Sequence, residues 1–98
     1  MPIAKLSAGE IEARMADHPG WEHRDDRIVR TFRFGSFARA FGWMSSVAIV
    51  ADKLDHHPEW RNVYATVEVE LTTHDAGGLS ERDFALARAM DELAAADA

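Results

Sequence analysis

The feature that most constrains the fold of this chain is a two-residue alternation of apolar and polar side chains from Val63 to Leu71. Successive side chains of a β-strand point to opposite faces of the sheet, so the alternation predicts a strand with one buried and one solvent-facing side. The stretch is longer than an ordinary strand, and either a bend or a hairpin near Tyr64 to Thr66 would accommodate it. A sheet with one apolar face needs helices to cover that face.

The amino-terminal third of the chain predicts a helix followed by a hairpin. Ser7 and Glu10 form a capping box, and the helix after them ends before His18-Pro19-Gly20, because the residue preceding a proline leaves the helical region. Short alternation from Trp21 to Phe34 around Asp25-Asp26 predicts a β-hairpin. Its apolar side carries Ile28, Phe32 and Phe34 together with Arg30, which either snorkels at a sheet margin or marks a partly covered face.

Two further helices are predicted on either side of the alternating stretch. Ser36 caps a long helix that Pro58 stops. After a turn at His74 to Gly78, Ser80 and Asp83 form a second capping box that begins the last helix. Their apolar stripes, at three- and four-residue steps, are Phe37, Phe41, Met44, Val47, Ala51 and Leu54 in the long helix and Phe84, Ala87, Met90, Leu93 and Ala94 in the last one.

This order of elements predicts the fold class. Hairpins supply antiparallel strand pairs, and helices that share one apolar surface pack on one side of the sheet. We therefore expect a single α+β domain over residues 1–98, with an antiparallel four-stranded sheet and helices packed on one face as a two-layer sandwich.

Composition excludes several classes of function. Acidic residues outnumber basic ones 17 to 11, and the formal charge of −6 disfavours direct binding to nucleic acid. Absence of cysteine rules out disulfides, thiolate metal sites and cysteine nucleophiles. No apolar run approaches the length that spans a membrane, so we expect a soluble, cytoplasmic protein. A chain of 98 residues has a small core, and we expect it to self-associate.

A candidate site lies where the long helix gives way to the following strand. Adjacent imidazoles at His56 and His57 precede Pro58, and the proline gives them different backbone conformations and separate directions. If the helix persists through His56, Asp52 lies one turn earlier and orients that ring. His74, at the far end of the alternating strand, would meet the pair at one rim of the sheet. These residues alone leave a polar surface loop and a functional site equally open.

Other chemistries fit these residues less well. Metal ligands on one helix are usually three to five residues apart, whereas adjacent histidines diverge, so we predict no metal site. Ser7, Ser36 and Ser80 are explained as helix caps, and Gly77-Gly78 lacks the spacing of a phosphate loop. Isolated His18 and His23 are predicted to be solvated. Tryptophans usually belong to a core, but Trp60 adjoins the histidines and could face a flat heteroaromatic ligand.

Several segments together resemble the pterin-4a-carbinolamine dehydratase family. The resemblance covers most of the domain, and the pairing of two histidines, proline and tryptophan with a later Thr-His-acid turn is specific. The segments that carry it are Asp52 to Trp60, Asn62 to Tyr64, Leu71 to Asp75, Gly78 to Ser80 with Asp83, Arg39 to Met44, and Trp21.

The resemblance implies a function and a set of roles. The family removes water from a 4a-hydroxytetrahydropterin to give the quinonoid dihydropterin, which is recycled for aromatic amino-acid hydroxylation, and it forms dimers or tetramers. It needs no cofactor, since the pterin is the substrate. By similarity, His56, His57 and His74 are catalytic and also bind substrate, together with Pro58, Thr73, Asp75 and Ala76; Asp52, Asp55, Trp60, Asp83 and Trp21 support the site.

Two alternatives stay open beside that reading. Some members of the family act as dimerisation partners of a transcription factor, which makes a co-regulator binding module the rival from another class. Another pterin, for instance one of molybdopterin-related metabolism, is the alternative substrate. Asp52 stands where relatives often have glutamate, which leaves open whether its shorter side chain reaches His56 directly.

Overall fold

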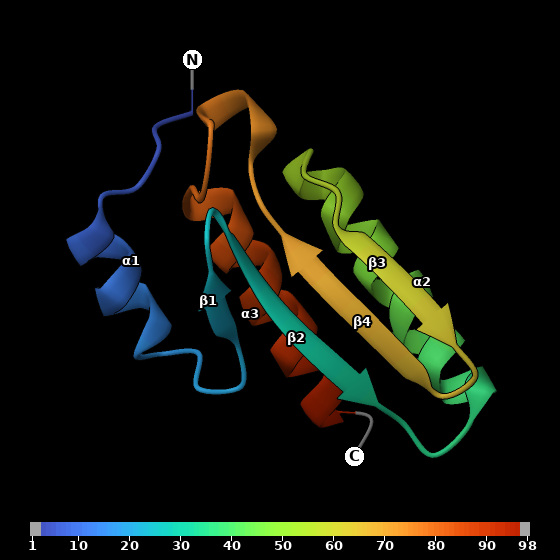
Figure 1. Cartoon of the computed structure of the whole chain (residues 1–98). Coiled ribbons are helices and arrows are strands. Elements are labelled where there is room, and N and C mark those ends of the chain that lie inside the picture. Colours follow the sequence, from blue (N-terminus) through green and yellow to red (C-terminus); the bar gives the residue numbers. More distant parts are fainter. Residues whose placement is uncertain (1–2, 97–98) are drawn as a thin grey trace.

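A computed structural model describes residues 3–96 of the chain, and Figure 1 shows its arrangement. Two helices, α2 and α3, lie behind a four-stranded sheet, and the short helix α1 lies to one side near β1. In chain order the elements are α1 (Ala8–Met15), β1 (Glu22–Arg24), β2 (Arg27–Arg33), α2 (Phe37–Leu54), β3 (Glu59–Val63), β4 (Thr66–Leu71), the 3-10 helix η1 (His74–Ala76) and α3 (Glu81–Ala96).

The sheet is antiparallel throughout, with strand order β1-β2-β4-β3. Ile28 of β2 pairs with Leu71 of β4, and Trp60 of β3 pairs with Val69 of β4. The side chains of these four residues belong to the apolar side of the sheet, which packs against α2 and α3. The predicted fold class, α+β with a four-stranded antiparallel sheet and helices on one face, is confirmed.

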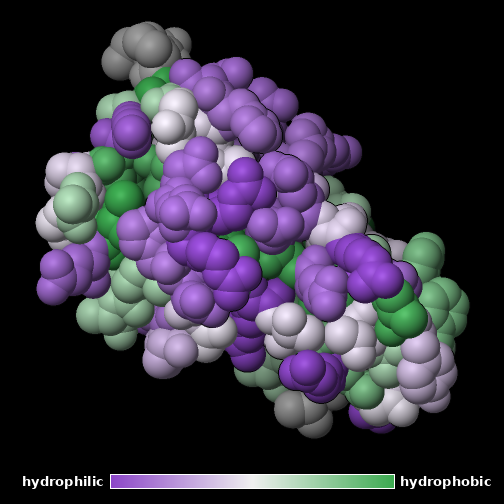
Figure 2. All heavy atoms as spheres, in the orientation of Figure 1, coloured by the Kyte–Doolittle hydropathy of each residue, from purple (hydrophilic) through white to green (hydrophobic). Residues whose placement is uncertain are grey.

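The open face of the sheet is polar, as Figure 2 shows by the hydrophilic side chains across the face turned to the viewer. Arginines and glutamates on neighbouring strands neutralise one another there. Arg27 contacts Glu70 at 3.1 Å and Arg61 contacts Glu68 at 3.3 Å. Arg27 and Arg61 are therefore matched with carboxylates, and the arginines of this face form no continuous basic surface.

The long helix buries only part of the predicted stripe: Val47 and Ala51 are buried and Met44 and Leu54 pack against the core, but the two phenylalanines do not. Phe37 and Phe41 are 49% and 54% exposed, and the side of α2 that faces the core carries Ala40, Trp43, Val47 and Ala51. Trp43 decides this orientation, because its ring packs 4.4 Å from that of Phe32 and its indole N–H donates to the Met90 carbonyl of α3. The prediction that Phe37 and Phe41 belong to the core was wrong.

The long alternating stretch forms a hairpin of β3 and β4 and not one bent strand. Tyr64 takes a left-handed conformation with φ 51°, and the chain reverses there between β3 and β4. The Asn62 side chain stabilises the turn by donating to the carbonyls of Tyr64 and Thr66. Because the reversal interrupts the alternation, Val63 faces outward and is 53% exposed, whereas the pattern placed it with the buried residues.

The predicted capping box at the amino terminus is present. Ser7 and Glu10 exchange hydrogen bonds of 2.9 and 3.2 Å, and the bond donated by the Ser7 backbone lowers the pKa of the Glu10 carboxyl. The segment before α1 runs beside the chain that precedes α3, where the Leu6 N–H donates to the Leu79 carbonyl at 2.9 Å. This contact brings the amino-terminal segment to the edge of the pocket described below.

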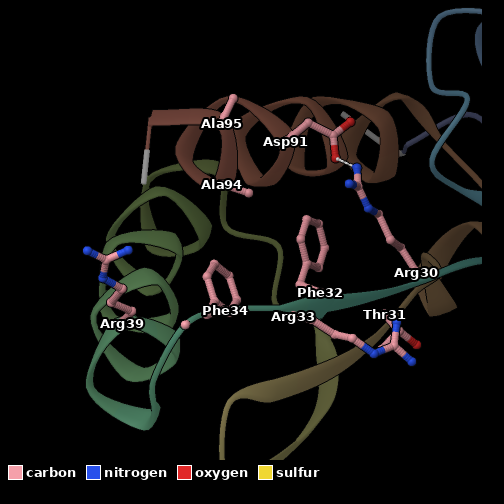
Figure 3. A pocket seen from close by; sticks show the side chains of 10 residues that line it. Arg30, Thr31, Phe32, Arg33, Phe34, Arg39, Asp91, Ala94 and Ala95 are labelled. Atoms are coloured by element: carbon pink, nitrogen blue, oxygen red, sulfur yellow. Dashed lines mark hydrogen bonds and ion pairs between the residues drawn. The ribbon is translucent and has the colours of Figure 1, made fainter. Parts of the chain in front are cut away.

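Arg30 does not snorkel into solvent but reaches across to α3. Its guanidinium donates to the Asp91 carboxylate at 2.7 Å, beside a pocket of about 370 Å³. Figure 3 shows this contact, with the rings of Phe32 and Phe34 beside it. The indole N–H of Trp21 donates to the same carboxylate at 2.8 Å. Asp91 therefore holds the first hairpin and the loop before it against α3.

We predict that Asp91→Ala lowers the free energy of unfolding by about 2 kcal/mol, because Arg30 and the Trp21 indole N–H lose their partner in a partly buried position. Urea denaturation followed by circular dichroism measures the change. Glu92→Ala is the control, since Glu92 is exposed and contacts Arg88 of the same helix. Equal losses in the two variants would contradict the prediction.

Candidate active site

The carboxylate of Asp83 organises the end of the molecule that carries the histidines. It is fully buried at the beginning of α3. Oδ1 lies 2.6 Å from His56 Nε2, while Oδ2 accepts from the Thr73 hydroxyl at 2.8 Å and from the Ser80 backbone N–H at 3.0 Å. An ionised carboxylate accepts hydrogen bonds and donates none, so it keeps a proton on Nε2 and fixes the tautomer of His56.

The predicted capping box at Ser80 and Asp83 is present in a modified form. Asp83 accepts from the Ser80 N–H as expected, but Ser80 Oγ accepts from the Arg82 N–H at 3.3 Å and lies 2.6 Å from Thr73 Oγ1. One network thus satisfies the buried polar groups of the helix start and binds the turn after β4 to it.

The end of α2 decides how the two adjacent imidazoles diverge. The helix stops at Leu54, before Pro58 is reached, and Asp55 takes a left-handed conformation with φ 52° and ψ 43°. The His56 N–H then donates to the Ala51 carbonyl at 3.0 Å and closes the helix. A left-handed conformation costs an L-residue about 1 to 2 kcal/mol. Here it turns His56 inward and leaves His57 at the surface.

Asp52 contacts His57 and not His56, which corrects the predicted pairing. Asp52 Oδ1 lies 3.4 Å from His57 Nε2, and both side chains are well exposed. The predicted pair required the helix to continue through His56. Because α2 ends earlier, His56 turns away toward Asp83 and the next imidazole takes the place beside Asp52.

The third imidazole is held by the turn after β4. His74 begins η1, and its Nε2 lies 3.2 Å from Glu59 Oε2 of β3. Backbone hydrogen bonds between Thr73 and Gly78, at 3.0 and 3.3 Å, close the turn. Gly77 has φ 76°, a conformation that suits glycine. Each of the three histidines therefore has one carboxylate partner of its own.

A pocket of about 240 Å³ brings these elements together. All three predicted histidines line it, so the expectation that they meet at one rim of the sheet agrees with the structure. Its walls come from the end of α2, the turn after β4, the first turn of α3 and the amino-terminal segment. The lining residues are Ile3, Asp55, His56, His57, Thr72, Thr73, His74, Asp75 and Arg82.

Other predicted site residues lie elsewhere. Trp60 faces the core of the sheet, with its ring 6.1 Å from that of Trp43, and it does not line the pocket. Trp21 is buried on Phe32 and Asp91. Neither tryptophan walls the site, because strand alternation turns Trp60 to the helix side. Pro58 and Ala76 adjoin lining residues in the chain but are not among them.

Sequence reasoning missed three lining residues, of which Arg82 carries a charge. A cation in the first turn of a helix opposes the helix dipole, and this signal was available in the sequence. Thr72 belongs to a segment already singled out. Ile3 gave no signal, because its contribution depends on the pairing of the amino-terminal segment with Leu79.

The arrangement is suited to proton transfer. His57 and His74 are 66% and 78% exposed and can exchange protons with solvent or ligand, while His56 is enclosed and fixed. Within residues 3–96, no three histidine, aspartate or glutamate side chains are grouped so that they could hold a metal ion. In the same range no helix is long and apolar enough to cross a membrane.

The fold and this pocket define a class: a small α+β protein that brings three histidines together at one end of its sheet. A family model described as pterin 4 alpha carbinolamine dehydratase matches residues 4–93. The chain belongs to this family.

Curated relatives carry the same family name as a provisional assignment. A pterin-4-alpha-carbinolamine dehydratase of Novosphingobium aromaticivorans is 56% identical over 95 residues, which cover 95% of this chain and 99% of the relative. Another from Jannaschia is 63% identical over 84 residues, covering 84% and 85% of the two chains.

Solved structures agree with the fold. A protein of Brucella melitensis titled transcriptional coactivator/pterin dehydratase has a TM-score of 0.89 and 41% identity, with 92% of this chain and 98% of that chain covered. A pterin dehydratase-like RuBisCO assembly factor of the alpha-carboxysome has a TM-score of 0.62 and 23% identity, covering 76% and 86%, and shares the fold.

We predict that Asp83→Ala lowers the free energy of unfolding by about 3 kcal/mol, because the variant leaves His56, the Thr73 hydroxyl and the Ser80 N–H without their buried acceptor. Urea denaturation measures the loss. Asp75→Ala is the matched control, an exposed acid in the same pocket, with an expected change below about 0.5 kcal/mol. A loss for Asp83→Ala no larger than the control's would refute the assignment of Asp83 as the organising group.

Proposed function

We propose that this pocket dehydrates a 4a-hydroxytetrahydropterin to the quinonoid dihydropterin and water. The observation that supports the proposal is the convergence of three imidazoles, each with its own carboxylate, on one pocket of a protein of the pterin 4 alpha carbinolamine dehydratase family. The same reaction would serve pterin recycling for aromatic amino-acid hydroxylation in the cytoplasm.

The reaction requires two proton transfers. The 4a-hydroxyl group leaves as water once an acid protonates its oxygen, and the C–O bond electrons depart with it. A base then removes the proton from the neighbouring ring nitrogen, and the nitrogen electrons form the new double bond. Imidazole titrates near neutral pH and can perform either task. Neither step draws on a metal or an organic cofactor.

We assign the proton transfers to His57 and His74. Both imidazoles are exposed, and Asp52 and Glu59 lie beside them as orienting carboxylates. His56 is enclosed, with Nε2 committed to Asp83, and we assign it to binding and orienting the pterin. Thr73, Asp75 and the neighbouring Pro58 and Ala76 would complete the binding surface.

We predict that His57→Ala and His74→Ala each lower kcat/KM by about 10²-fold, the usual contribution of a general acid or base, while the variants fold normally. The measurement follows the absorbance of 4a-hydroxytetrahydropterin, generated by a hydroxylase, as it decays with and without the protein. His23→Ala is the control, because His23 is an exposed residue of β1 outside the pocket. If the decay is no faster at high protein concentration than without protein, the dehydratase proposal is wrong.

Exposed apolar residues favour a second role, a protein-binding surface that supports self-association. The rings of Phe37 and Phe41 lie 5.8 Å apart on the outer side of α2, and Ile49 of the same helix is 61% exposed. Folded monomers seldom leave such side chains grouped in solvent. We propose that α2 forms part of the interface of a homodimer or homotetramer, and that a co-regulator partner would use this helix face.

We predict that Phe41→Glu reduces the molecular mass measured by analytical ultracentrifugation to that of a smaller species, because a charge is placed in the apolar contact. Arg88→Glu on the exposed side of α3 is the control and leaves the mass unchanged. Identical masses for the parent protein and Phe41→Glu would exclude this helix face as the interface.

A further inference from the structure

Arg82 places a full positive charge in the pocket. It lies in the first turn of α3, is half-buried, and lines the pocket together with the three histidines. Its guanidinium donates to the Asp55 main-chain carbonyl at 3.3 Å, a long hydrogen bond to a neutral acceptor. Much of its donor capacity stays available to a ligand, since a guanidinium has five N–H donors.

Most of the other arginines have a carboxylate partner, which Arg82 lacks within the described residues. Six of the nine arginines of the chain lie within 4.0 Å of a carboxylate oxygen: Arg14, Arg24, Arg27, Arg30, Arg61 and Arg88. Within residues 3–96, Arg82 has no carboxylate at that distance, although Asp55 and Asp75 line the same pocket. Arg33 and Arg39 also lack a carboxylate at that distance among the described residues, and they line the separate pocket beside β2.

The position of Arg82 is unfavourable with respect to the helix dipole, in contrast to its neighbours Glu81 and Asp83. A cation in the first turn of a helix lies at the positive end of the helix dipole, which disfavours it by about 0.3 to 1 kcal/mol. A residue that breaks a local rule is expected at sites that bind a ligand. Arg82 has a neutral partner in the Asp55 carbonyl, and a carboxylate or phosphate group of a ligand would supply an anionic one.

The chemistry of the proposed reaction does not account for this charge. The pterin ring is neutral, and its dehydration needs groups that gain and lose protons near neutral pH. Arginine stays protonated throughout that range and cannot act as acid or base. Its guanidinium instead matches planar carboxylates and phosphates through paired hydrogen bonds.

We propose that Arg82 is a specificity-determining residue, which makes the pocket prefer pterins whose 6-substituent ends in an acidic group, a carboxylate or a phosphate. The proposal rests on the dehydratase function proposed above, because it assumes that the pterin ring lies against the histidines. It extends that function to the class of substrate, since a pterin with a neutral side chain leaves the guanidinium without an anionic partner.

Three product-like probes test the preference: 6-hydroxymethyl-7,8-dihydropterin, its monophosphate ester, and 7,8-dihydropterin-6-carboxylate. Their dissociation constants are measured by isothermal titration calorimetry at low ionic strength. We expect one or both acidic probes to bind about tenfold tighter than the neutral probe, as a charge-assisted contact provides. The two acidic probes distinguish a carboxylate from a phosphate. Added salt is expected to reduce the difference in affinity between the acidic and neutral probes, since the contact between Arg82 and the acidic group is partly exposed to solvent.

Variants of Arg82 separate recognition from a structural role. Arg82→Gln is expected to abolish the preference, Arg82→Lys to retain part of it, and Arg88→Gln, on the exposed part of α3, to keep it entire. If Arg82 acted through the Asp55 carbonyl alone, its loss would weaken all three probes equally and the ratio of affinities would stay unchanged. That result would overturn the proposal.

A parallel assay keeps the two proposals distinguishable. The parent protein is tested for dehydration of 4a-hydroxytetrahydropterin with a neutral 6-methyl group. If this substrate turns over and the neutral and acidic probes bind with equal affinity, the dehydratase proposal is supported and the proposed role of Arg82 is rejected. Absence of turnover for this substrate and for one with an acidic 6-substituent would reject the dehydratase, while the affinity ratios would still decide whether Arg82 selects anionic pterins.

Discussion

The contact between Asp83 and His56 is the interaction on which the functional end of the molecule depends. One buried carboxylate joins the end of α2, the turn after β4 and the start of α3 through three hydrogen bonds. Burial of a carboxylate is costly unless its oxygens are fully satisfied, and here each oxygen has a partner. The network therefore sets the relative positions of segments that are distant in the sequence, and the pocket lies where they meet.

This network gives the histidines unequal freedom. His56 is fixed by an enclosed partner, whereas His57 and His74 meet exposed carboxylates across 3.4 and 3.2 Å. A fixed ring can hold a flat ligand in one orientation, and exposed rings can exchange protons with solvent. Two adjacent residues thus acquire different chemistry because Asp55 reverses the chain between helix and strand.

Much of the fold could be predicted because periodicity and capping are local signals. The order of helices and strands, the Ser7 box and the polar open face follow from them, and so does the meeting of the three histidines. The predictions that failed depended on rotation and register. Phe41 lies outside the core because Trp43 sets the rotation of α2. Trp60 does not line the pocket because strand alternation places its side chain on the helix-covered face of the sheet. Ile3 could not be found, since a backbone contact far along the chain brings it to the pocket.

The distribution of the pocket over four separate segments links ligand binding to folding. Unfolding separates Ile3, His57, His74 and Arg82, so the unfolded chain offers no site and the ligand binds the native state alone. A ligand at a hundred times its dissociation constant then adds about 2.7 kcal/mol to the stability of the fold. For a chain of 98 residues with a small core, that is a large share of its stability. The concentration of any ligand that binds this pocket would therefore help set how much of this protein is folded.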